Sequence, residues 1–346
     1  MTEDDHAVAG SLTRATLWPS RAGIGVVAAV FSLGVSLPEW LRYLPLLASV
    51  ALIGLPHGAV DHLAVPRARG EEASPRWYAR VGLLYLLVGG AYAVLWFLAP
   101  RLSVVLFIAM TWAHWGQGDL WPLLSVTGVD HLRSRAQRFG TLLVRGGLPM
   151  LVPLWSFPGR YRAVVDAIVG RFGFPGGALD PFFEPGVRFG VVGGLAALSV
   201  VTVAAGYLRA DERRDWAVDA GETALLWWFF AVVPPVFAIG VYFTVWHSLR
   251  HVGRLVATDP AGRAALATER PVAAFGQFAR EATPLTLLSL IVLAGLYATV
   301  PDPPADVGEF VGLYLVFIAV LTLPHVVVVA LMDAEQNVWR VESVKS

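Results

Sequence analysis

Apolar segments long enough to cross a lipid bilayer recur along nearly the whole chain. A membrane-spanning helix needs about 20 consecutive, mainly apolar residues, and helices are one of only two structures that satisfy every backbone polar group inside lipid. The segments lie near residues 22–38, 44–63, 81–99, 102–121, 140–157, 187–208, 217–233, 235–256, 284–300 and 308–331. They predict an all-α, polytopic membrane protein with about ten transmembrane helices.

Composition favours one integral membrane domain over residues 1–346, with polar tails at 1–21 and 332–346. Of the 346 residues, 56% are hydrophobic and 15% are charged, whereas soluble domains average about 25% charged residues. The acidic start, from Met1 to Asp5, differs from a secretory signal, so we expect the first apolar span to be retained. A formal net charge of zero gives no support for nucleic-acid binding.

The distribution of basic residues decides between one kinked helix and a tight hairpin at Pro234-Pro235. Cytoplasmic loops carry the excess of Lys and Arg. A hairpin places 20 of the 26 basic residues on the cytoplasmic side, whereas a single helix divides them 13 to 13. We therefore expect ten helices in the cell membrane, with both termini cytoplasmic. The basic residues left outside are Arg42, Arg101, Arg160, Arg162, Arg171 and Arg188.

Two longer connections, at 158–186 and 257–283, each admit two interpretations. The first contains apolar and basic residues between 160 and 169 that favour an interfacial amphipathic turn. The second contains Phe275 and Phe278 at helical spacing. The alternative is that both segments are plain connectors.

Six of the eight histidines lie inside or at the edge of apolar segments. An ionisable group is costly inside a bilayer, so an intramembrane histidine indicates function. The chain has no cysteine, which excludes thiolate ligands and cysteine-bound iron–sulfur clusters. The histidines occur in the patterns Pro56-His57-Gly58-Ala59-Val60-Asp61-His62, Ala113-His114-Trp115-Gly116, Trp246-His247-Ser248-Leu249-Arg250-His251 and Leu323-Pro324-His325. They predict a metal site formed by imidazoles within the membrane.

The ten-helix topology places these histidines at similar depth, in the cytoplasmic half of the bilayer. His57, His114 and His247 are each the thirteenth or fourteenth residue of spans that run toward the cytoplasm. His251 lies one turn deeper, and His325 is the eighteenth residue of its span. Because His247 and His251 are four residues apart, they share one helix face and can bind one metal. The alternative is that backbone carbonyls satisfy both rings.

Three further residues are candidates for orienting the ligands or for gating the site. Asp61 has helical spacing from His57 and is suited to fixing the tautomer of a ligand. Asp119 follows His114 near the end of the same span, and His325 is a fifth ligand, an orienting group or a gate. His62 is expected to be structural or peripheral, and no catalytic role is expected for His6 or His131.

The four histidine patterns specify the identity of the metal and the contacts with a substrate less closely than they specify the ligands. All-imidazole sites suit zinc, copper, iron or nickel, and spacing alone does not choose among them. One His-x-x-x-His box is too few for a di-iron desaturase, so a mononuclear site fits better. Arg250 is expected to snorkel or to pair with a carboxylate. Aromatic candidates for lining a hydrocarbon substrate, with ordinary lipid-facing packing as the alternative, are Trp112, Trp115, Trp227, Trp228, Tyr242 and Phe243.

The four histidine patterns, in this order, resemble the bacteriorhodopsin-related protein (Brp/Blh-like) family of membrane β-carotene 15,15′-dioxygenases. The resemblance runs from about residue 44 to 331, and Trp115 replaces the phenylalanine usual in the family. It implies one Fe(II) per chain, with O₂ and β-carotene as reactants and two all-trans-retinal as products. It also implies that the iron ligands are His57, His114, His247 and His251.

Other functions remain open at the level of sequence. They are another intramembrane lipid-oxidising iron enzyme, a metal transporter, and an opsin-assembly or carotenoid-binding protein that cleaves nothing. The histidines cluster at one depth, which argues against a transport path. The only lysine, Lys345, lies in the C-terminal tail, so the chain cannot carry retinal as an intramembrane Schiff base. A functional link to a separate retinal-binding opsin fits the expected product.

Overall fold

The computed structural model describes residues 2–174, 177 and 179–341, and every regular element in these ranges is a helix. The first part of the chain forms α1 (Glu3–Leu12), η1 (Thr13–Leu17), α2 (Trp18–Ser32), α3 (Glu39–Ala51), η2 (Pro56–Gly58), α4 (Asp61–Ala68), α5 (Pro75–Leu84), η3 (Tyr85–Gly89), α6 (Gly90–Leu98), α7 (Pro100–Pro122), η4 (Leu123–Thr127) and α8 (Arg135–Ser156). The remainder forms α9 (Pro158–Gly170), η5 (Asp180–Phe183), α10 (Pro185–Arg209), α11 (Arg213–Val232), α12 (Pro235–Val241), η6 (Tyr242–Ser248), α13 (Leu249–Thr258), α14 (Pro260–Ala267), α15 (Pro271–Thr299) and α16 (Val307–Glu335). The all-α prediction is confirmed.

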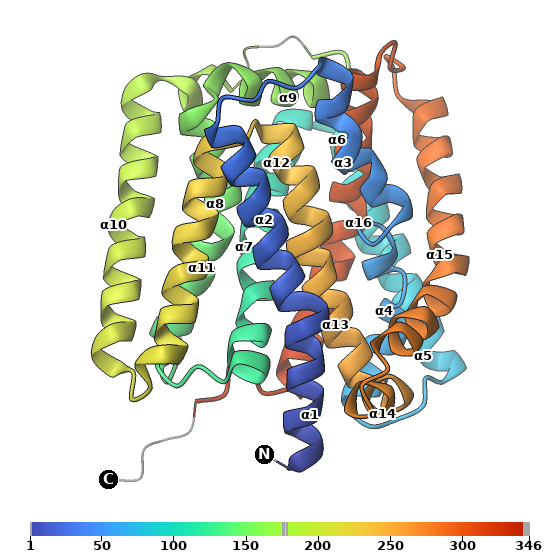
Figure 1. Ribbon diagram of the computed structural model, residues 1–346. Coiled ribbons are helices and arrows are strands. Elements are labelled where there is room, and N and C mark those ends of the chain that lie inside the picture. The colour runs from blue at the N-terminus through green and yellow to red at the C-terminus, as the bar shows by residue number, and fades with distance from the viewer. Residues whose placement is uncertain (1, 175–176, 178, 342–346) are drawn as a thin grey trace.

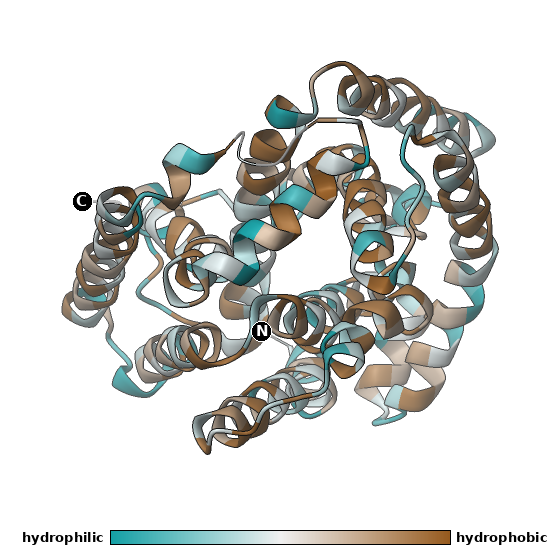
Figure 2. Ribbon diagram, turned by 90° about the horizontal axis from the view of Figure 1, so that it is seen from above, coloured by the Kyte–Doolittle hydropathy of each residue, from teal (hydrophilic) through white to brown (hydrophobic). Residues whose placement is uncertain are grey.

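The long helices stand side by side as a bundle, and the chain passes back and forth between its two ends (Figure 1). Helix α9 lies across one end, whereas α14 lies at the opposite end, where α1 begins (Figure 1). Viewed from above, the helices carry apolar residues along much of their length (Figure 2). Many large apolar side chains are exposed on the bundle, among them those of α10 and α15, which suits contact with lipid rather than with water.

Four helical segments of the described chain are long and apolar enough to cross a membrane. They are Pro75–Leu98, Pro185–Arg209, Pro271–Thr299 and Val307–Glu335. A fifth segment passes the same test if the two parts of the bent pair Glu39–Gly58 and Asp61–Ala68 count as one span. These segments identify a membrane protein, as the composition predicts.

The chain reverses direction at Pro234. Helix α11 ends at Val232, and both Val233 and Pro234 are extended, with ψ of 130° and 141°. Helix α12 begins at Pro235 and returns alongside α11 (Figure 1). The hairpin prediction is therefore confirmed, and the alternative of one kinked helix is wrong. Proline at the first position of a helix costs no hydrogen bond, which suits this sharp restart.

Most of the expected apolar segments lie inside observed helices to within one residue, but the segment expected at 22–38 leaves its helix after Ser32. Three further departures concern other predicted segments. The polar segment at 1–21 is helical from Glu3 and continuous with α2, and Val8 and Leu12 are buried. The connections at 158–186 and 257–283 contain α9, α14 and the start of α15. The segment expected at 44–63 is interrupted after Ala51 and bent by about 40°. The expected C-terminal tail extends beyond the described residues at 342–346.

Helices α7 and α8 approach each other closely through glycine. A Cβ atom on Gly116 would lie 2.0 Å from the carbonyl oxygen of Leu142, and one on Gly146 would lie 1.8 Å from that of Trp112. Small residues allow this approach between membrane helices. The contact fixes the part of α7 that carries His114 against α8.

Replacing Gly146 by Ala is expected to push these helices apart and to destabilise the fold by about 1–3 kcal/mol, as overpacking does. The measurement is the thermal unfolding midpoint in detergent. Gly194→Ala on α10 is the matched control, because a Cβ there meets no atom within 4 Å. Equal midpoints for the two variants would contradict the close contact.

Candidate metal centre

Five histidines from five helical elements meet inside the bundle. They are His57 on η2, His114 on α7, His247 on η6, His251 on α13 and His325 on α16, and each is between 2% and 7% exposed. Ring centroids lie 4.9 Å apart for His57 and His325, 4.8 Å for His114 and His247, and 5.3 Å for His251 and His325. The candidate site therefore unites residues up to 268 positions apart, from 57 to 325.

His57 is positioned by an interruption in its helical segment. Gly54 and Pro56 follow the end of α3, and His57 lies in the short helix η2. A side chain at position 54 would collide with Ser49 and Phe243, whose atoms would lie 2.6 and 2.7 Å from its Cβ. The Nδ1 atom of His57 donates to the Gly54 carbonyl oxygen. Because Nδ1 holds the proton, Nε2 of His57 is free to act as a ligand.

His247 lies in a π-helical segment, η6, that continues directly into α13. Segments of this kind are rare and frequent at functional sites. The rings of His247 and His251 are almost parallel, at 5°, with centroids 6.5 Å apart. The two rings share one face of the helix, as their spacing predicts.

Asp61 fixes the orientation of His325. Its two carboxylate oxygens accept from Nδ1 of His325 at 2.8 and 2.9 Å, and Oδ2 also accepts from the hydroxyl of Tyr85 at 2.6 Å. The spacing from His57 suggested that Asp61 would orient His57, but its partner is His325. Pro56 and Gly58 interrupt the ideal helix on which that expectation rested.

The free nitrogens fit a metal ion. Nε2 of His114 and Nε2 of His247 face each other at 3.1 Å, and one nitrogen each from His57, His114 and His325 lie within 4.8 Å of one another. Nε2 of His251 and Nε2 of His325 are buried without a hydrogen-bond partner in the described parts of the chain. Buried polar atoms are normally paired, so converging free imidazole nitrogens favour a bound cation. Neutral imidazoles suit first-row metals such as iron or zinc.

The other sequence candidates lie outside this cluster. Asp119 accepts from the indole of Trp246 at 3.0 Å, and its ion-pair partners are Arg145 and Arg250. His62 packs against the ring of Tyr78, with centroids 5.3 Å apart. His131 is buried and bonded to Asp219 at 2.9 Å, whereas His6 is exposed.

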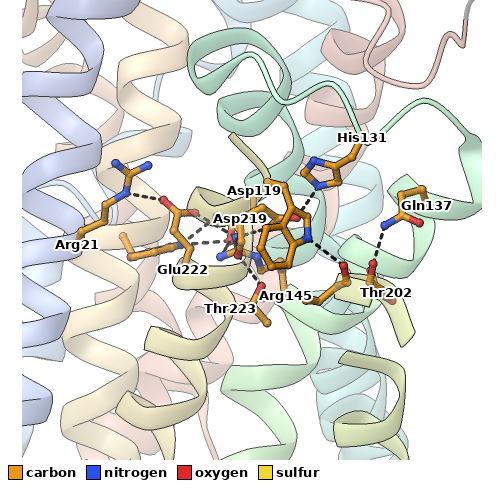
Figure 3. A network of polar contacts seen from close by, with 12 residues as sticks. Arg21, Asp119, His131, Gln137, Arg145, Thr202, Asp219, Glu222 and Thr223 are labelled. Atoms are coloured by element: carbon orange, nitrogen blue, oxygen red, sulfur yellow. Dashed lines mark hydrogen bonds and ion pairs between the residues drawn. The ribbon is translucent and has the colours of Figure 1, made fainter. Parts of the chain in front are cut away.

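A buried ionic network, shown in Figure 3, lies beside η6 and α13. Arg145 pairs with Asp219 at 2.7 Å and with Glu222 at 3.2 Å. Glu222 also pairs with Arg250 and Arg21, both at 2.8 Å. Arg250 is 2% exposed, so it pairs with a carboxylate and does not snorkel. The guanidinium groups of Arg21, Arg145 and Arg250 thus face three carboxylates, those of Asp119, Asp219 and Glu222.

This network was not predicted from the sequence, although charges inside apolar segments signalled it. Asp219 and Glu222 fall within the predicted span 217–233, and Arg145 falls within 140–157. Such charges are rare and are usually paired. The guanidinium of Arg250 also lies 3.4 Å from the ring centroid of Trp246. Arg250 therefore couples the network to the helix that carries His247 and His251.

A cavity of about 980 Å³ borders the histidine cluster. His57, His114, His247 and His325 line it, and so do Trp115 and Phe243 among the aromatic candidates. The remaining candidates contact protein: Trp112 donates to the carbonyl of Leu143, Tyr242 packs on Trp115, Trp227 donates to Ser199 and Trp228 donates to Ser32. Most other lining residues are apolar, so the cavity suits a lipid-soluble molecule.

The fold and the site together define an all-helical membrane protein with a buried histidine cluster beside a large apolar cavity. Residues 48–333 match the family model of β-carotene 15,15′-dioxygenase, so the chain belongs to that enzyme family. This confirms the resemblance carried by the four histidine patterns.

Relatives of similar length agree with this assignment. The chain is 49% identical over 328 residues to the probable β-carotene 15,15′-dioxygenase Blh of Halobacterium salinarum, covering 95% of each chain. It is 31% identical over 345 residues to the probable β-carotene 15,15′-dioxygenase Brp of the same species, covering 93% of each. A β-carotene 15,15′-dioxygenase of an uncultured marine bacterium is 31% identical over 87 residues, which is 25% of this chain and 30% of that one. No solved structure matches the chain.

Asp61→Asn is expected to weaken metal binding by about 10- to 100-fold, because it removes the carboxylate that orients His325. The measurement is chelator competition on protein loaded anaerobically with Fe(II). Asp4→Asn, at an exposed position in α1, is the matched control. Unchanged affinity in the Asp61 variant would limit Asp61 to a purely structural role.

Proposed function

We propose that this chain cleaves the central double bond of β-carotene with O₂, inside the membrane, to give two molecules of all-trans-retinal. One Fe(II) per chain is its cofactor. The observation that carries the proposal is the convergence of five buried imidazoles, four of which line an apolar cavity. Membership of the β-carotene 15,15′-dioxygenase family supports the substrate and the reaction.

The reaction balances without a reductant or a net proton. One carbon–carbon double bond is broken, each of its carbons forms a double bond to one oxygen atom, and O₂ supplies both oxygen atoms. Bound Fe(II) supplies the site at which O₂ becomes reactive. The histidine ligands in this proposal are His57, His114, His247 and His251.

His325 is a fifth candidate ligand beside these four histidines. Its Nε2 atom is buried and free in the described chain, and Asp61 holds the proton at Nδ1. The hydrogen bond from Tyr85 keeps Asp61 in place. Tyr85 and Asp61 both line the cavity, so this chain of contacts connects the substrate space with a ligand.

The wall of the cavity binds and orients the hydrocarbon. Trp115 and Phe243 lie close to His247, with ring centroids 5.8 and 6.2 Å away. Flat aromatic and aliphatic walls bind a polyene through dispersion and exclude water from it. Exclusion of water keeps the reaction at the histidines apart from bulk solvent.

We further propose that ten helical segments cross the bilayer, with both termini in the cytoplasm. They are α1–α2, α3–α4, α5–α6, α7, α8, α10, α11, α12–α13, α15 and α16. The 20-to-6 division of basic residues supports this orientation. Retinal released into the lipid is then available to a separate opsin.

The wild-type protein is expected to bind one iron and to form retinal as the sole product. His247→Ala and His251→Ala are expected to lose iron and product together, because each removes a ligand. The measurements are elemental analysis after anaerobic purification and chromatography of products from carotene-producing cells. His6→Ala is the matched control, since His6 is exposed on α1.

Three results would overturn this assignment. Two irons per chain would favour another lipid-oxidising iron enzyme. Tight zinc without any dependence of activity on iron would exclude the proposed cofactor. No aldehyde in the presence of iron, O₂ and reductant would favour an opsin-assembly or carotenoid-binding protein.

A reporter fused near residue 305 is expected to lie outside the cell, because the loop between α15 and α16 has no basic residue from Pro301 to Asp306. A reporter near residue 268, between α14 and α15, is expected in the cytoplasm. Enzymatic reporters active on only one side of the membrane provide the measurement. A cytoplasmic signal at 305 would refute the ten-span topology.

A further inference from the structure

The cavity beside the histidines has two unlike ends. At one end, beneath α9, it is lined by Met150, Pro153, Val164, Ile168 and Val236, all buried or half-buried. At the other end its walls include Leu86 of η3 and Leu285, Leu288 and Val292 of α15, which are 71%, 39%, 52% and 48% exposed. The cavity is therefore closed beneath α9 and reaches the surface between η3 and α15.

The open end faces the lipid phase. Both of its walls belong to segments that are long and apolar enough to cross a membrane, Pro75–Leu98 and Pro271–Thr299. Each wall contacts α16, which lies behind the gap and carries His325. In Figure 1, α15 stands at the edge of the bundle. A hydrocarbon dissolved in the bilayer thus reaches the cavity sideways without entering water.

The closed end is built by the helix that crosses the end of the bundle. Val164 and Ile168 lie four residues apart on α9, so they share a face of that helix, and both line the cavity. Met150 and Pro153 of α8 complete this wall. Helix α9 packs against α16, α7 and α8, so the wall is fixed to the same helices that carry His114 and His325.

We infer that the gap between η3 and α15 is the lateral substrate entrance, and that the wall beneath α9 is a stop that selects the double bond to be cleaved. This inference rests on the proposed function. A conjugated polyene is a stiff rod, so the end that enters first stops at Val164 and Ile168. The distance from that stop to the histidines then fixes which bond lies beside them. In β-carotene the two ends are alike, so either end can enter first.

Shortening the closed end tests the stop. Val164→Trp is expected to hold β-carotene at a shallower position and to yield pairs of apocarotenals of unequal length in addition to retinal. Ala163→Trp is the matched control, because Ala163 is the neighbouring residue of α9, is exposed and does not line the cavity. Ile168→Phe is a second, smaller change of the same wall. Thermal midpoints and iron content identify variants that fold.

Narrowing the open end tests the entrance. Leu288→Trp is expected to lower kcat/KM by about an order of magnitude, with retinal still the only product. Leu287→Trp is the matched control, because Leu287 is 56% exposed on the same helix but does not line the cavity. Initial rates are measured in liposomes that contain β-carotene, so that the substrate arrives from lipid.

The outcomes distinguish failure of the proposed function from failure of the stop or of the entrance. If the wild-type protein forms no aldehyde, the proposed function fails. If the wild type forms retinal and both folded α9 variants also form retinal alone at wild-type rates, the stop is refuted while the function stands. If Leu288→Trp and Leu287→Trp have equal kcat/KM values, the entrance is refuted.

Discussion

Burial of charge in an apolar bundle is the constraint on which the rest of this structure depends. A buried ion without a partner is costly, and removal of one member of a buried pair commonly costs about 3–5 kcal/mol. Arg145, Glu222 and Arg250 satisfy this requirement by pairing across α8, α11 and α13. The pairing fixes α13 in rotation and depth, so His251 of α13 and His247 of the adjoining η6 face the same space as the histidines of η2, α7 and α16.

The histidines arrive at the site largely where regular helix geometry fails. His57 lies beyond the end of α3, where its ring bonds to the carbonyl of Gly54. His247 lies in the π-helical segment η6, and His325 follows Pro324 inside α16. Such irregularities are stable inside a membrane protein only when other groups satisfy the freed backbone atoms. The Nδ1 atom of His57 satisfies one such atom, the carbonyl oxygen of Gly54, so this interruption and the site stabilise each other.

Hydropathy and spacing predicted most of the architecture, because both depend on local sequence. The helix pattern and the shared face of His247 and His251 could be predicted from residues close in sequence, whereas the hairpin at Pro234 was predicted from the division of basic residues along the whole chain. The partner of Asp61 could not, because that prediction assumed an ideal helix across Pro56. The ionic network of Asp219 with Arg145 was also not predicted, because pairing between distant helices leaves no periodic pattern in the local sequence. The cavity, which Trp115 lines and Tyr242 does not, required the same three-dimensional information.

Charge balance around the histidines explains why Asp61 would matter to a cation bound there. The network of Arg145 is formally neutral, and Arg254 pairs with Asp333 at 2.7 Å on another side of the cluster. Asp61, in contrast, has no ion-pair partner in the described residues other than His325. Its charge is supported by hydrogen bonds from His325 and Tyr85. A divalent cation bound at Nε2 of His325 would offset that charge through the ring between them, and the carboxylate would in turn make the imidazole a stronger ligand. An ion bound there and Asp61 would thus stabilise each other across one imidazole.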